Sequence, residues 1–305
     1  MSNTVSVAAV IVNYRRYDLL ESCIASVLDS SRAPDEIVVV DNATEQSRLA
    51  EIAAAFPTVR VIGNEDNRGY AVACNQGWRA TAADQVLFLN ADITLPATSL
   101  GECLAEAQKS ADIAVVTCRL LRPDGRFDHA CHRGTPTPAA SLAYALRLHR
   151  VFPRSRRLAR YTMSWLDPRG VHDIEACSGA FMLVARADLE TVGGWDERYW
   201  FYAEDIDLCL RLRRTGKRVR YVGTATAIHV KGASSNLRAS SRELPPDERR
   251  HKRQVQRAIV ASHSLFFREH FQRTTPLPLS IAIRGIFAMQ RLRLSLVARL
   301  DVLLA

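Results

Sequence analysis

Apolar runs alternate with amphipathic, helix-like segments over the first 120 residues, and this alternation constrains the fold more than any other feature. The runs are rich in Val, Ile and Leu and lack strict polar alternation, which is typical of strands covered on both faces. They are VAAVIVNY (7–14), EIVVVDN (36–42), VRVIGN (59–64), QVLFLNAD (85–92) and IAVVTC (113–118). The pattern predicts an α/β fold with a mostly parallel central sheet, right-handed crossovers and helices on both faces.

Several of these runs finish in polar residues, namely Asn13, Asp41, Asn64, Asn90 and Asp92. In open α/β sheets, ligands bind beyond the carboxyl ends of the strands. A single polar strand end marks a turn, whereas several at one sheet edge favour a binding site. We therefore expect a ligand at this edge.

The rest of the chain changes character twice. Residues 121–170 are irregular, with Pro, Gly and Arg around one weak helical pattern, and are typical of a surface excursion. Order returns with a strand and short helix in 177–194 and a helix that ends at Gly216. After residue 236 the chain is polar, basic and helical, which predicts a domain of residues 1–236 followed by an amphipathic extension, 237–305.

The net charge of +9 is unevenly distributed. Between His129 and Trp165 there are seven arginines and no Asp or Glu. Such clustering favours an anionic partner: a membrane surface, a phosphorylated substrate or nucleic acid. Apolar residues beside the arginines favour the membrane surface, and no nucleic-acid-binding fold accompanies the charge, so we expect no nucleic acid. The charge could also belong to ordinary solvated faces.

Cysteine usage and the N-terminus indicate the compartment. The seven cysteines form no CxxC pair and no metal-finger spacing, as expected for free thiols in a reducing environment. The first apolar run lacks a preceding basic segment, and no uncharged apolar run reaches the ~18 residues of a spanning helix. We expect a cytoplasmic protein.

Several nucleotide and nucleophile signatures are missing. No GxGxxG follows the first strand, and neither GxxxxGK[ST] nor GxSxG occurs. These absences disfavour a dinucleotide-binding dehydrogenase, a P-loop enzyme and an α/β-hydrolase.

The candidates that remain are carboxylates, amides and glycine turns. Asp41 can accept from a pyrimidine N–H or a ribose hydroxyl, or can cap the next helix, and both readings stay open. In FLNAD, Asn90 and Asp92 can point the same way from an extended backbone. Oxygen ligands suit Mg²⁺ or Mn²⁺, so Asp92 can hold such an ion against a diphosphate. His229 is either a further ligand or a structural histidine.

The stretch YWFYAEDIDLCLRLRRTG (199–216) places three carboxylates between four aromatics and a basic helix. Acidic residues favour the first turn of any helix, because its free N–H groups carry partial positive charge. Asp207 fits that explanation, whereas Asp205 is our candidate for a catalytic base, with Glu204 as an orienting or acceptor-binding partner.

The ordered series VIVNY, VVVDNA, NRGYAVACNQG, LFLNAD, CSGAFMLVAR, GGWDERYWFYAEDIDLCLRLRRTGK and HVKGASS resembles family-2 glycosyltransferases of the GT-A (Rossmann-like) fold. It is most similar to the rhamnosyltransferase-like branch of bacterial surface-polysaccharide assembly. The resemblance covers roughly residues 5–236. It implies a nucleotide-sugar-binding half, 1–120, and an acceptor-binding, catalytic half, 121–236.

For the donor, the resemblance implies that Asp41 contacts the nucleoside and that Asn67, Gly69 and Asn75 line the sugar-nucleotide site, with the strand-end Asn13 beside them. Asp92 matches the last position of the family's DxD metal motif. The first position is Asn90 here, which removes one charged ligand. His229 matches a position linked to the metal and the diphosphate.

For catalysis, Asp205 matches the base, and Trp195 and Asp196 match positions that shape the donor-sugar and acceptor site. The implied reaction is inverting transfer from a nucleotide-diphospho-sugar, with dTDP-rhamnose one candidate, to a glycan or polyprenyl-diphosphate-linked sugar. A divalent cation (Mg²⁺ or Mn²⁺) is the implied cofactor. The implied location is the inner face of a bacterial cytoplasmic membrane, as a peripheral protein, and a homo-oligomer stays open.

Two alternatives remain at this stage. A sugar-1-phosphate nucleotidyltransferase has a similar sheet and uses a metal ion in a similar way. Such enzymes usually carry a Gly-rich basic loop where this chain has NYRRYD. A non-catalytic scaffold that binds sugar nucleotide is favoured by Asn90 and disfavoured by the presence of both Asp92 and Asp205.

Overall fold

The computed structural model describes residues 5–230 and 245–303. One mixed sheet forms its centre, with strand order β3-β2-β1-β4-β8-β6-β9-β5, and β7 pairs with β9 beside this path. The strands are Val7–Asn13 (β1), Glu36–Asn42 (β2), Arg60–Asn64 (β3), Gln85–Asn90 (β4), Ile93–Thr94 (β5), Ile113–Leu121 (β6), Val171–Ile174 (β7), Phe181–Ala185 (β8) and Arg218–His229 (β9).

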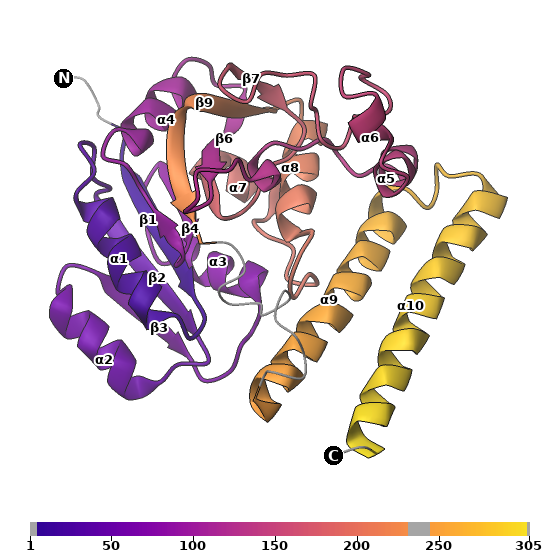
Figure 1. Cartoon of the computed structure of the whole chain (residues 1–305). Coiled ribbons are helices and arrows are strands. Elements are labelled where there is room, and N and C mark those ends of the chain that lie inside the picture. The colour runs from indigo at the N-terminus through magenta and orange to yellow at the C-terminus, as the bar shows by residue number, and fades with distance from the viewer. Residues whose placement is uncertain (1–4, 231–244, 304–305) are drawn as a thin grey trace.

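Helices cover the sheet and extend from it (Figure 1). They are Tyr17–Leu28 (α1), Gln46–Ala55 (α2), Tyr70–Arg79 (α3), Ser99–Ala107 (α4), Pro138–Ala145 (α5), Leu148–Val151 (α6), Arg186–Val192 (α7), Glu204–Arg214 (α8), Pro246–His270 (α9) and Leu277–Leu303 (α10), with a short 3₁₀ turn at His129–Cys131 (η1). The mixed α/β architecture predicted from the sequence is confirmed.

The first four strands form the parallel part of the sheet. β1 lies between β2 and β4, and its side chains are buried along its whole length. Burial of a Val, Ile or Leu side chain contributes roughly 1.5–3 kcal/mol, which explains why these runs lack polar alternation. The register places Asn13 opposite Asp41 and Val12 opposite Asn90. The polar strand ends therefore meet at one edge, as expected.

The second half of the sheet mixes parallel and antiparallel strand pairs. β8 runs antiparallel to both β4 and β6, because the chain returns to the sheet from the opposite end after the excursion that follows β6. β9 is parallel to β6 and antiparallel to β5 and β7. The pairing of Ile93 with His229 brings the segment after β4 against the end of β9.

The two C-terminal helices differ in how they are packed. Figure 1 shows them side by side, with α9 against the body of the molecule and α10 outermost. Ser262 of α9 donates a hydrogen bond to the Phe201 carbonyl (2.9 Å), and His270 contacts Asp207 of α8 (2.7 Å). Within the described part of the chain, no helix is both long and apolar enough to cross a membrane. The predicted boundary at residue 236 lies outside the described residues.

Candidate active site

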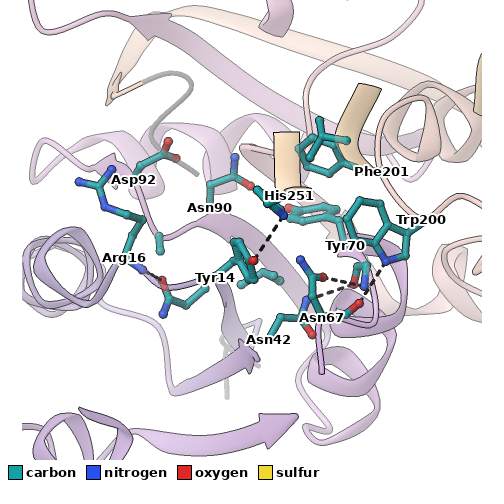
Figure 2. A pocket seen from close by; sticks show the side chains of 15 residues that line it. Tyr14, Arg16, Asn42, Asn67, Tyr70, Asn90, Asp92, Trp200, Phe201 and His251 are labelled. Carbon is teal, nitrogen blue, oxygen red and sulfur yellow. Dashed lines mark hydrogen bonds between the residues drawn. The ribbon is translucent and has the colours of Figure 1, made fainter. Parts of the chain in front are cut away.

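A pocket lies at the carboxyl ends of β1 and β4, closed on one side by α9 (Figure 2). Its free volume is about 100 Å³. The predicted donor-site residues on its wall are Asn13, Asn67, Gly69, Asn90 and Asp92. The sheet edge and the glycine turn thus form one site, although the two segments are far apart in the sequence.

Asp41 lies beneath this wall and does not line it. Its Oδ1 accepts from Asn13 Nδ2 (2.8 Å) and its Oδ2 accepts from the Tyr17 hydroxyl (2.7 Å). Burial raises the pKa of Asp41, against the opposing effect of these two donors. In this arrangement Asp41 orients Asn13 toward the pocket, and its direct contact with a nucleoside stays a prediction.

The glycine turn owes its shape to Trp200. Gly69 has φ +91°, and a Cβ atom there would lie 2.6 Å from the Trp200 carbonyl oxygen, so both the backbone angle and the space require glycine. Asn67 Oδ1 accepts from the Gly69 amide (3.0 Å), and the Trp200 indole donates to the Asn67 carbonyl (3.1 Å). The turn and the aromatic segment before α8 therefore form one wall of the pocket.

Asn75, Trp195 and Asp196 do not line the pocket either. Asn75 is buried in α3, where its amide bonds the backbone N–H and C=O of Trp195 (3.0 and 2.8 Å). Trp195 is in the core, with its ring edge-on to Phe88 at 5.1 Å. Asp196 is paired with Arg198 (2.7 Å). The structure gives Asn75 and Trp195 a role in fixing α3 against the turn before α8, and their ligand contacts stay predictions.

Asp92 and His229 meet beside the pocket. The imidazole Nε2 lies 3.3 Å from Asp92 Oδ1, and Nδ1 lies 3.2 Å from Asp128 Oδ2. Burial opposes protonation of the ring, but the two carboxylates outweigh it and raise the pKa of His229 to about 9. The imidazolium therefore balances two buried negative charges.

This cluster fits a divalent cation. Asp92 Oδ1 is buried and, among the described residues, no donor is aligned with it for a hydrogen bond. Asp128 holds the far side of the His229 ring, which is the usual support for a metal-ligating histidine. Asp92 and His229 would hold the ion, which would displace the imidazole proton. Within residues 5–230 and 245–303 no group of three or more His, Cys, Asp or Glu side chains has metal-binding geometry, so further ligands would come from the substrate.

Asp205 occupies the first turn of α8 and is held by three donors. Its Oδ2 accepts from Arg133 (2.8 Å) and from the Gly179 amide (3.3 Å), and its Oδ1 accepts from the Ile206 amide (2.8 Å). Arg133 is itself anchored by a bond to the Cys177 carbonyl (3.2 Å). The carboxylate is thereby fixed in one orientation, as a catalytic base requires.

The other two acids of this turn differ from Asp205. Glu204 is buried with Oε2 lacking a hydrogen-bond partner among the described residues, and burial together with the charge of Asp205 raises its pKa well above the ordinary value. Glu204 therefore holds a proton more readily than an ordinary glutamate does. Asp207 accepts from Arg211 (2.6 Å) and contacts His270 of α9 (2.7 Å), so it links two helices in addition to its place in the first turn.

Backbone strain lies immediately before these acids. Tyr202 and Ala203 both have φ +69°, in the left-handed region that residues with side chains rarely adopt. Strain of this kind is of order 1–3 kcal/mol per residue and persists where surrounding contacts enforce it. Here the bond from Ser262 of α9 to the Phe201 carbonyl is one such contact.

α9 also lines this pocket, through His251 and Val255. His251 stacks on Tyr14 with ring centroids 4.7 Å apart, and its Nδ1 lies 3.3 Å from the Tyr14 hydroxyl (Figure 2). Pockets that bury drug-sized ligands usually span about 300–1,000 Å³, well above the volume found here. Side chains of α9 such as His251 must therefore shift before a nucleotide-sized ligand can enter.

Sequence reasoning missed four residues that shape the site: Tyr17, Asp128, Arg133 and His251. Arg133 belongs to the acid-free basic stretch, but nothing in the sequence distinguishes it from the other arginines there. Asp128 and His251 are brought to the site by the long excursion and by α9. Their partners are distant in sequence, so local patterns carry no signal for them.

Comparison with known proteins identifies similar families. The family model described as glycosyl transferase family 2 matches residues 8–193. An N-acetylglucosaminyl-diphospho-decaprenol L-rhamnosyltransferase of Mycobacterium tuberculosis (strain H37Rv) is 28% identical over 237 residues, which cover 74% of this chain and 76% of the relative. Rhamnosyltransferase WbbL of Escherichia coli (strain K12) is 29% identical over 221 residues, covering 68% of this chain and 79% of the relative.

Two solved structures share the fold. GalNAc-T7 with UDP, GalNAc and Mn²⁺ superposes with a TM-score of 0.56 at 15% identity, covering 84% of this chain and 55% of the other. The mannosyltransferase PcManGT from Pyrobaculum calidifontis, in complex with GDP-Man and Mn²⁺, gives 0.52 at 17% identity, covering 93% and 79%. At these identities the likeness supports the GT-A fold alone.

Proposed function

Because this chain belongs to glycosyl transferase family 2, we propose that it transfers a sugar from a nucleotide-diphospho-sugar to a hydroxyl group of a lipid-linked sugar, with inversion at the anomeric carbon. The observation that carries the proposal is the presence of two buried carboxylates that differ in their hydrogen bonding. Asp92 has an oxygen without an aligned donor among the described residues, whereas Asp205 is held in one orientation by Arg133. The family match favours a transferase over a nucleotidyltransferase or a scaffold.

The donor would occupy the pocket between the sheet edge and α9. Asn13 and Asn67 would contact the nucleoside and sugar, with Asp41 and Trp200 fixing their orientation. Asp92 and His229 would hold a divalent cation, which when bound supplies positive charge against the diphosphate leaving group. The donor dTDP-rhamnose is the first candidate, because both relatives are named as rhamnosyltransferases.

Asp205 would remove the proton from the attacking acceptor hydroxyl. Its fixed carboxylate contributes a factor of about 10²–10⁴ through base catalysis, and positioning of the two substrates supplies more. Glu204, whose buried carboxyl group has a raised pKa, would orient the acceptor or the neighbouring base. No covalent intermediate is required.

A donor screen tests this proposal. Thermal unfolding is followed with dTDP-rhamnose, UDP-galactose, UDP-glucose and GDP-mannose, each with and without Mn²⁺. A ligand that binds the folded state raises the apparent unfolding temperature. We expect one donor to do so, and more strongly with Mn²⁺. If none of the donors shifts the transition and none is consumed, the proposed transfer is wrong.

The acceptor and the membrane belong to the same proposal. A polyprenyl-diphosphate-linked sugar is the proposed acceptor, by analogy with the name of the mycobacterial relative, and an anionic membrane surface is the proposed partner. The apolar outer surface of α10 supports this location. Removal of residues 276–305 should weaken sedimentation with anionic vesicles, and full retention would contradict membrane docking by this helix.

A further inference from the structure

A groove runs between α9 and α10, on the side of α9 that carries Arg268. Its volume is about 660 Å³. Phe267 and Ile281 give it an apolar floor, and Arg268, Arg284 and Arg291 line it. We refer to this feature as the α9–α10 groove. It is larger than the donor pocket and separate from it.

The groove is open because small residues face it. Gly285 and Ala288 lie on its α10 wall, and a Cβ atom added to Gly285 would meet no atom within 4 Å. The helices contact each other along a neighbouring stripe, where Phe287 lies 6.5 Å from Phe267 between ring centroids and Ser280 is buried. The α9–α10 groove therefore lies beside a direct contact between the two helices.

The charge around the groove is of one sign. Arg284 and Arg291 are seven residues apart, which places them about two turns apart on one side of α10. Neither forms an ion pair with any described residue, and no Asp or Glu lines the groove. Arg268 pairs with the adjacent Glu269 at 3.4 Å. Arg284 and Arg291 thus face a space where the described lining residues include no counter-charge.

The apolar floor continues onto the outer surface of α10. Ile281 lines the groove and is 59% exposed, and Leu292 on the same helix face is 60% exposed. An apolar helix surface of this kind is normally covered by another helix or by lipid. The occupant must therefore combine an anionic head with an apolar tail.

A second copy of the chain fits this surface poorly. From Leu277 to Val297, α10 contains three arginines and no acidic residue. Pairing this face with itself would bring like charges together without counter-charges, which is destabilising. Anionic lipid offers the complementary charge and the apolar contact together.

We propose that the α9–α10 groove seats the phosphate headgroup of an anionic phospholipid, with Arg284 and Arg291 binding phosphate oxygens. The acyl chains would lie along Ile281 and Leu292. The inference rests on the membrane partner of the proposed function, but not on sugar transfer. It goes beyond the proposed function because it assigns lipid binding to one defined groove and not to the overall positive charge of the chain.

Arg291→Gln and Arg293→Gln are a matched pair that tests this assignment. Both remove one positive charge from an exposed position of α10, but only Arg291 lines the groove. The probes are phosphatidylcholine vesicles with and without phosphatidylglycerol, and the readout is cosedimentation of the full-length protein. We expect binding only to the anionic vesicles, weakened about tenfold by Arg291→Gln and little changed by Arg293→Gln. Equal losses in the two variants would overturn the headgroup seat.

A steric variant provides the second arm. Gly285→Leu fills the groove without changing charge, and the open space around Gly285 lets the helix accept the side chain. We expect it to weaken vesicle binding while the unfolding temperature is maintained. Unchanged binding would show that the groove is not the seat. A dimer in vesicle-free solution that Arg291→Gln dissociates would also overturn the proposal, in favour of a second copy.

The two proposals can fail separately. The donor-induced rise in unfolding temperature, measured on the same variants without vesicles, reports the sugar-transfer site. If it is absent in the unaltered protein, the proposed transfer fails and the vesicle result still stands. If it is present while Arg291→Gln and Arg293→Gln bind vesicles equally, only the groove fails.

Discussion

Asp92 and Asp205 are both nearly buried carboxylates, yet their oxygens are satisfied in opposite ways. Asp205 accepts from a guanidinium and two backbone amides. Asp92 has one buried oxygen to which no described residue donates an aligned hydrogen bond, with protonated His229 at 3.3 Å. The hydrogen bonds of Asp205 are thus all supplied by the protein, whereas Asp92 can accept a further ligand.

The difference indicates which parts of the chemistry are preorganised. A group fixed by three donors does not need to reorient during reaction, which suits a base. A buried oxygen without a donor is destabilising on its own, at about 1–3 kcal/mol, and is expected where a ligand completes the site. The proposed base is thus ready before substrate binds, whereas the proposed cation site awaits it.

The largest effect is expected from Asp205→Asn. The amide keeps the shape of the side chain but cannot accept a proton, so turnover should fall by about 10²–10⁴. Donor binding, measured by thermal shift, should remain, because Asp205 does not line the donor pocket. Unchanged turnover would remove Asp205 as the base.

Asp92→Asn should produce the complementary result. Loss of the carboxylate should weaken Mn²⁺ affinity, measured with a nucleoside diphosphate present, by about 10- to 100-fold. Asp205→Asn is the matched control, since it makes the same chemical change away from the cation site and should leave Mn²⁺ affinity intact. If both variants behave alike in this titration, the two clusters do not have separate roles.

Arg133→Lys addresses the positioning of the base. Lysine keeps the positive charge but loses the planar, rigid guanidinium whose Nη2 donates to both Asp205 and the Cys177 carbonyl. We expect kcat to fall about tenfold with little change in KM for the donor, because small displacements of a catalytic group are costly. Arg160→Lys, at a more exposed pair with Glu175 in the same segment, should change neither value.

Glu204→Gln should have the smallest effect of these substitutions, and that effect should be on stability. The folded-state pKa of Glu204 is raised. Its contribution to the free energy of unfolding is therefore fully present below the unfolded-state pKa and is lost as the pH rises. As the pH rises above the unfolded-state pKa of a glutamate, the unaltered protein should therefore lose more stability than Glu204→Gln. The unfolding temperature should differ by about 2–4 °C per kcal/mol. Parallel pH curves would mean that folding does not raise the pKa of Glu204.

Strand-end chemistry was predictable from the sequence because it is local. Asn13, Asn90 and Asp92 each follow an apolar run, and parallel pairing places such ends together. The helix that carries Asp205 and its end at Gly216, which has φ +87°, follow from capping and first-turn rules. The fold class and the grouping of these polar residues at one sheet edge could therefore be predicted without a structure.

Side-chain partnerships could not be predicted in the same way. Trp195 stands in an acidic, glycine-containing turn that suggests exposure, but it lies in the core because Asn75 anchors its backbone. Arg133 becomes the partner of Asp205 only through the path of the excursion after β6. Contacts of α9 with Tyr14 and Phe201 depend on tertiary packing that no local pattern encodes.

The position of β9 has a consequence for how the molecule is assembled. β9 is the last strand among residues 5–230 and 245–303, and it pairs with β5, β6 and β7. Its final residue, His229, meets Asp128 from 101 positions earlier. Such long-range pairing slows folding, because loop closure precedes the contacts that reward it. A nascent chain that has not yet extended past β9 can form the parallel sheet and present Asp92, but it lacks the imidazole opposite. The contact between Asp92 and His229 therefore forms late in synthesis, when β9 joins the sheet.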